Sequence, residues 1–199
     1  AIGGLGLREA ALRDLSSLFM RGRYDQANVV FATSFFLVAV LYGVVFVVGQ
    51  LLGPWLVTML SYPDPETGAM YLSLMLFVLL IQQLVSMLTM TFQASHLYKL
   101  GALHSVCMNG ITSVGAFLTI TLSHSMIALG IFRAVALVLF LVYLLFDIFK
   151  FRPCRLYGNF SICIALEMIR YGRSIVGTKL LALGVNGLDR IFFVSAFGL

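Results

Sequence analysis

The hydrophobic positions of this chain form long stretches that are separated by short groups of charged residues. Residues 26–63, 67–98 and 100–132 contain no Asp, Glu, Lys or Arg. A hydrocarbon core about 30 Å thick is crossed by a helix of about 20 apolar residues, so each stretch is long enough to span a membrane. The predicted spans cover residues 28–49, 69–92, 100–122 and 125–146, and a fifth begins near Ser174.

Two segments beside the first span receive a different prediction. Gly53-Pro54 is expected to end the first helix, because proline lacks the backbone N–H that an interior helical turn requires, and a short interfacial piece, PWLVTML, follows it. The opening AIGGLGLREAALRDL is predicted to be the end of a preceding membrane helix that runs into a basic loop. We therefore interpret the sequence as a fragment of a longer protein.

The composition supports a membrane protein. Of 199 residues, 61% are hydrophobic and 11% are charged, and the mean hydropathy is +1.02. Soluble domains carry about 25% charged residues, so a soluble globular enzyme is a poor interpretation. The predicted fold class is all-α: a polytopic integral membrane helical bundle with about five spans and the end of a preceding one.

The positive charges predict an orientation. The formal net charge is +5, and Lys and Arg occur before the first span, at Lys99, and in the loop 147–173. The loops around Asp64 and His124 contain no Lys or Arg. Short basic loops stay on the cytoplasmic side, so this alternation places the basic segments inside. It also argues against nucleic acid as a partner, because the basic excess belongs to these loops.

Polar side chains follow one face of each of two predicted spans, at helical spacing. The first stripe contains Gln82, Ser86, Thr89, Gln93 and His96, and the second contains Ser105, Asn109, Thr112, Thr119 and Ser123. Such residues allow membrane helices to approach closely and to hydrogen-bond with one another. They also line hydrated cavities. Both interpretations stay open at the level of sequence.

Cationic side chains inside the spans give a sharper signal. Arg133 is eight residues past Ser125, about 12 Å into its helix, where it either faces a partner or water or extends to the interface. Lys179, Asn186 and Arg190 share one face of the fifth helix, and Asp189 is the acid nearest to them. This excess of cations favours a passage for an anionic group.

No catalytic or metal-binding arrangement is apparent, and we predict neither an enzyme nor a cofactor. The three histidines, His96, His104 and His124, are scattered along the chain without a nearby acid or nucleophile in sequence. Helix ends are common positions for such single histidines.

Two segments resemble the polysaccharide flippase family, the O-antigen and exopolysaccharide transporters of the multidrug/oligosaccharidyl-lipid/polysaccharide exporter superfamily. GLGLREAALRDLSSLFMRGRYDQA is similar to the exit of the family's second helix, and MIRYGRSIVGTKLLALGVNGLDRIFFVSAFGL is similar to the start of its seventh, with Tyr171-Gly172 and Asp189-Arg190 at the matching places. The resemblance implies the end of the second helix and the third to sixth helices of an N-terminal lobe in 1–146, a cytoplasmic linker in 147–173, and the truncated first helix of a C-terminal lobe in 174–199.

The resemblance also implies a function. The family moves an undecaprenyl-pyrophosphate-linked glycan from the cytoplasmic to the periplasmic leaflet of the inner membrane by alternating access, as a multi-pass protein beside other membrane proteins of polysaccharide assembly. The polar stripes would contact the sugar, while Arg133, Lys179 and Arg190 would contact the pyrophosphate. Two alternatives remain: a multidrug or cation antiporter of the same superfamily, and a non-transport membrane subunit of polysaccharide assembly.

Overall fold

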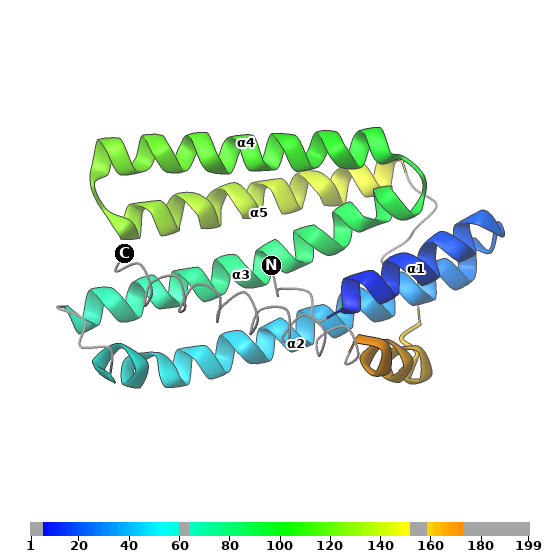
Figure 1. The fold of residues 1–199 in the computed structure, drawn as a ribbon, viewed down its shortest axis with the longest axis horizontal. Coiled ribbons are helices and arrows are strands. Elements are labelled where there is room, and N and C mark those ends of the chain that lie inside the picture. Colours follow the sequence, from blue (N-terminus) through cyan, green and yellow to red (C-terminus); the bar gives the residue numbers. More distant parts are fainter. Residues whose placement is uncertain (1–5, 60–63, 152–158, 173–199) are drawn as a thin grey trace, which may run out of the picture.

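The computed structural model describes residues 6–59, 64–151 and 159–172, and these residues are helical apart from short turns and contain no strand. The labelled helices in Figure 1 are α1 (Leu7–Met20), α2 (Tyr24–Met59), α3 (Pro65–Ala94), α4 (Tyr98–Ser123) and α5 (Met126–Phe151). A further short helix covers residues 162–172. The predicted all-α helical bundle is confirmed.

Four of the described helices are long and apolar enough to cross a membrane, namely α2, α3, α4 and the 126–148 part of α5. Their length and composition indicate a membrane protein. The predicted fifth span, from Ser174, lies outside the described residues.

Helix α3 occupies the middle of the bundle and contacts each of the other four labelled helices. Figure 1 shows α2 along one side of α3 and the antiparallel α4–α5 hairpin along the other. Large side chains of α3, including Leu88 and Phe92, are fully buried in these contacts. By contrast α4 exposes large apolar side chains such as Val106, Val114 and Phe117, as a surface that faces lipid would.

Tight turns connect consecutive helices and depend on residues in the left-handed backbone region. Gly22 has φ 67° between α1 and α2, His96 has φ 59° between α3 and α4, and His124 has φ 49° after α4. The N–H of Leu97 donates to the carbonyl of Phe92 at 2.9 Å, which closes the end of α3 in a Schellman-type turn. Two of the three histidines thus occupy positions that terminate helices.

The predicted break at Gly53-Pro54 is wrong, because α2 continues through Pro54 to Met59. Proline removes one N–H, so the helix loses a single backbone hydrogen bond near its end, and membrane helices tolerate this loss. A contact between helices holds this end of α2: the Ser73 hydroxyl donates to Gln50 Oε1 at 2.8 Å.

The prediction of a basic loop before the first span is also wrong, because residues 7–20 form α1. Leu7, Ala10, Ala11 and Leu15 are buried on one face, which packs against α2 and α3. An amphipathic helix of this kind alternates polar and apolar residues at helical spacing, and its low hydrophobicity conceals it beside a membrane span.

The short helix 162–172 lies beside α1 and the first half of α2. The backbone N–H of Ser161 donates to Thr33 Oγ1 at 3.1 Å, and the rings of Phe36 and Phe160 meet edge to face at 5.2 Å. The guanidinium of Arg13 stacks over the ring of Tyr171 at 4.3 Å. This helix is therefore joined to the part of the bundle where α1 lies.

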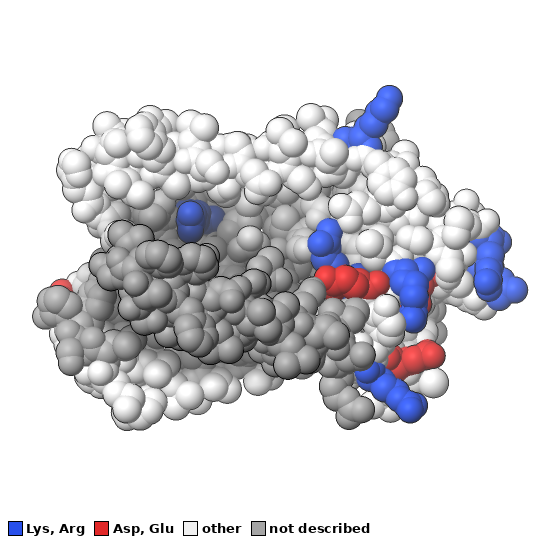
Figure 2. All heavy atoms as spheres, viewed as in Figure 1, with Lys and Arg blue, Asp and Glu red and all other residues white. Residues whose placement is uncertain are grey.

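The basic segments of the described chain meet at one end of the bundle. Figure 2 shows most of the Lys and Arg side chains in view at the end where α1 and the turn between α3 and α4 lie. Arg21, Arg23 and Lys99 are exposed there. The folded structure thus gathers at one end charges that are distant in sequence.

Candidate functional site

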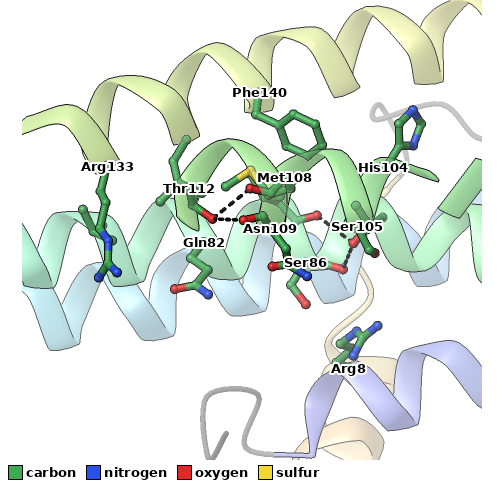
Figure 3. A pocket seen from close by; sticks show the side chains of 14 residues that line it. Arg8, Gln82, Ser86, His104, Ser105, Met108, Asn109, Thr112, Arg133 and Phe140 are labelled. Atoms are coloured by element: carbon green, nitrogen blue, oxygen red, sulfur yellow. Dashed lines mark hydrogen bonds between the residues drawn. The ribbon is translucent and has the colours of Figure 1, made fainter. Parts of the chain in front are cut away.

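A cavity of about 620 Å³ lies between α3, α4 and α5, with one end formed by α1. Figure 3 shows polar side chains of α3 and α4 directed into it, together with Arg133 of α5 and Arg8 of α1. Its polar and charged lining residues are Arg8, Gln82, Ser86, Thr89, His104, Ser105, Asn109, Thr112 and Arg133. The volume is within the range of about 300–1,000 Å³ that is usual for small-molecule sites.

The two polar stripes face each other across this cavity. Gln82 and Ser86 of α3 line it together with Asn109 and Thr112 of α4. The hydroxyls bond mainly within their own helices: Thr112 Oγ1, for example, donates to the carbonyl of Met108 at 2.8 Å. Among the described residues the side-chain amides of Gln82 and Asn109 form no hydrogen bond, and both residues are exposed. The amides are therefore free to bind a guest in the cavity.

The ends of the stripes lie outside the lining. Thr119 and Ser123 donate to the carbonyls of Gly115 and Thr119 on their own helix, at 2.7 and 2.6 Å. His96 ends α3, and its ring contacts Tyr98. The hydroxyls of Thr119 and Ser123 thus bond to carbonyls of α4 itself, and the middle of both stripes lines the cavity.

A guanidinium group lies at each end of the cavity. Figure 3 shows Arg133 extending from α5 at one end and Arg8 from α1 at the other. Arg133 is partly buried and has no ion pair or hydrogen bond with the described residues. Lysine and arginine side chains inside membrane bundles normally face a partner or water, and the structure directs Arg133 into the cavity rather than toward a described acid.

Arg8 is a cavity residue that the sequence interpretation missed. Its Nη2 donates to Gln93 Oε1 at 3.0 Å, so the predicted site residue Gln93 positions a cation. Its Nε is buried and has no acceptor among the described residues. An oxyanion would satisfy both the charge and this donor. The amphipathic pattern of residues 7–20 could have indicated Arg8, because it predicts a helix with one face packed against the bundle.

Three predicted site residues, Lys179, Asn186 and Arg190, lie outside the described residues. Their predicted role at a cationic face stays a prediction. The described part of the site therefore consists of the middle of the two polar stripes, Arg133 and Arg8.

The sequence showed no acid near any histidine, and this interpretation is wrong for His104. Its Nε2 lies 3.3 Å from Oδ2 of Asp147 and 3.4 Å from the hydroxyl of Tyr143. Helices α4 and α5 form a hairpin that turns next to Ser125, and residues 104 and 147 are almost equally distant in sequence from that turn. Folding the two spans back on each other at Ser125 would have revealed the pair.

The lining chemistry indicates what the cavity can hold. None of the described lining residues is Asp or Glu. No group of three or more His, Cys, Asp or Glu side chains with the geometry of a metal site occurs in the described part of the chain. Amides and hydroxyls bind the hydroxyls of a sugar, and two guanidinium groups bind an anion. The cavity is thus suited to a polar guest with negative charge.

The fold and the cavity together define a helical membrane protein with a polar, cationic cavity among its spans. Comparisons with protein-family models, with curated proteins and with solved structures find no match for this chain.

Proposed function

We propose that this chain belongs to a transporter that moves a lipid-linked oligosaccharide from the cytoplasmic to the periplasmic leaflet of the inner membrane. The observation that supports it most is the cavity between α3, α4 and α5, where amides and hydroxyls are combined with Arg8 and Arg133. A sugar diphosphate cannot cross hydrocarbon unaided, since burying its polar groups without partners costs several kcal/mol for each. A polar cavity lowers that cost while the lipid tail stays in the bilayer.

In this proposal the basic end of the bundle faces the cytoplasm. Arg8 and Gln93 then lie at the cytoplasmic end of the cavity, where the substrate enters, and Arg133 lies deeper along α5. The diphosphate binds to guanidinium groups and the sugars bind to Gln82 and Asn109. Neither guanidinium belongs to a closed site, which allows the release that transport requires.

The alternative of a drug or cation antiporter would require acidic residues in the cavity. Among the described lining residues the charged groups are Arg8 and Arg133, and this favours an anionic substrate. A non-transport subunit of polysaccharide assembly would need no such cavity.

The test is delivery of lipid-linked glycan to the periplasmic leaflet in cells that lack their own flippase. Arg8→Ala and Arg133→Ala should each reduce delivery at normal protein abundance. Arg21→Ala is the matched control, because Arg21 is exposed in a turn outside the cavity, and it should deliver normally. Normal delivery by both cavity variants would contradict the proposed substrate, and failure of the unaltered protein to deliver any glycan would contradict the proposed function.

A further inference from the structure

The His104–Asp147 pair is a buried ionisable pair that adjoins the cavity. His104 is 3% exposed, and the side chain of Asp147 is 11% exposed. The pair joins α4 to α5 near one end of helices that are long enough to cross a membrane, and buried ionisable side chains are costly unless they are paired. It is not needed to explain the binding of sugars or phosphate.

The contact between the two side chains is incomplete. Oδ2 of Asp147 lies at ion-pair distance from His104 Nε2, yet it accepts no well-aligned hydrogen bond from the described residues. Nδ1 of His104 is buried and likewise has no hydrogen-bond partner there. With a neutral imidazole the pair carries one negative charge, and with one added proton it is neutral.

The groups around the imidazole leave Asp147 as its dominant ionic neighbour. From α3 the ring of Phe92 meets it at 4.8 Å, and from α5 the rings of Phe140 and Tyr143 meet it at 6.3 and 5.6 Å. Of these only Tyr143 is ionisable, and its hydroxyl is the second polar neighbour of Nε2. Among the described residues of α1, Arg8 lines the same cavity as His104.

We propose that His104 and Asp147 together bind one proton, and that this proton strengthens the binding of an anionic group in the cavity. Without the proton, the negative charge of the pair opposes an anion that binds to Arg8 or to Arg133 in the same cavity. The proton comes from water, is shared by the two side chains, and returns to water when it leaves, so no other reactant is required. The proposal rests on the anionic substrate of the proposed function and adds its regulation.

Linkage makes this coupling measurable. If the protonated pair binds an anion more tightly, binding of the anion must draw protons onto the pair by the same factor. Inorganic pyrophosphate is the probe, added to the intact purified protein in weakly buffered detergent solution with a pH indicator. The protons taken up and the affinity are measured from about pH 5 to about pH 8, the range in which histidine pairs commonly titrate.

The unaltered protein should take up protons on binding, and its affinity should fall by roughly fivefold or more toward the alkaline end of the range. Asp147→Asn and His104→Gln preserve size and should each leave only the proton exchange of pyrophosphate itself. His124→Asn is the matched control, because His124 is exposed in a left-handed turn that asparagine tolerates, and it should behave like the unaltered protein.

The outcomes separate this inference from the proposed function. Binding of pyrophosphate with the same proton exchange in the unaltered protein and in Asp147→Asn refutes the inference and leaves the anion site intact. No binding by the unaltered protein refutes both. Because proton uptake by the unaltered protein is measured directly, a variant that fails to fold does not decide the result.

Discussion

Replacing Arg133 by leucine should change two measurable properties of the protein in opposite directions. The residue is seven positions after Met126, about 10 Å along α5 at 1.5 Å per residue, and its side chain lies in the cavity. It has no ion pair with the described residues. The substitution therefore removes a charge from the membrane region and from the anion site together.

The first property is the insertion of α5. An arginine at the centre of a span raises the apparent insertion free energy by about 2.5–3.5 kcal/mol, whereas leucine lowers it by about 0.3–0.6 kcal/mol. Arg133 lies about a third of the way across a core of roughly 30 Å, so the full difference is an upper limit. We expect Arg133→Leu to improve insertion of α5 by about 1–3 kcal/mol.

The second property is anion binding. A hydrogen bond to a charged group contributes about 1.5–3 kcal/mol. Removal of the guanidinium should thus weaken binding of inorganic pyrophosphate by roughly tenfold to a hundredfold. Arg133→Lys keeps the charge and should lose much less, since a lysine ammonium attracts phosphate as a point charge.

Insertion is measured by glycosylation of sites that flank α5 in a host membrane protein, and binding by equilibrium titration of the intact protein. Ile131→Leu is the matched control, because Ile131 is on the same helix with 47% of its surface exposed, and it should change neither property appreciably. Unchanged pyrophosphate binding in Arg133→Leu would remove Arg133 from the site. Poorer insertion would show that Arg133 stabilises α5 through a partner.

Two further predictions concern the helices that form the cavity. Gly115→Leu should destabilise the α4–α5 hairpin by about 1–3 kcal/mol, because a side chain at this position would overlap the ring of Phe132 on α5. Unfolding in mixed detergent measures this loss against Gly110→Leu, where no atom lies within 4 Å of an added Cβ. Equal losses in the two variants would contradict the packing argument. Hydrogen bonds from the hydroxyl and the backbone N–H of Thr67 hold the pKa of Asp64 below its ordinary value. Stabilisation of the α3 N-terminus by Asp64 is therefore present above the ordinary carboxyl pKa and is lost as pH falls through the lowered one. In Asp64→Ala the stability, measured by unfolding over a series of pH values, should no longer fall at low pH for this reason. The same fall in the variant as in the unaltered protein would refute the prediction.

The sequence predicted the long helices well because one signal dominates them. Absence of charge over 20 or more residues marks the first three predicted spans, and the fourth is apolar apart from Arg133. In the structure Asp64 caps α3, which starts at Pro65, before the predicted residue 69. Boundaries shifted by a few residues, as helix ends usually do. Pro54 misled the prediction because proline stops helices in water more strictly than it does in a membrane bundle.

The candidate site was predictable as far as periodicity extends along one helix. Spacing placed Gln82 with Ser86, and Asn109 with Thr112, but it did not reveal that the two faces meet. Contacts between helices require the hairpin geometry, and the His104–Asp147 pair was missed for that reason. Arg8 was missed because a short amphipathic helix beside a strongly apolar span lacks a distinctive hydrophobicity signal.

The proposed function depends most directly on a cavity that is hydrated and able to hold an anion. Single cysteines at Gln82 and Asn109 in the intact membrane-embedded protein test this, with Phe117, exposed on the outer face of α4, as the control position. We predict that a small water-soluble thiol reagent modifies both cavity positions, that pyrophosphate slows this modification, and that the cysteine at 117 stays unreactive. Absence of modification at all three positions, or modification that pyrophosphate does not slow, would contradict the proposed function.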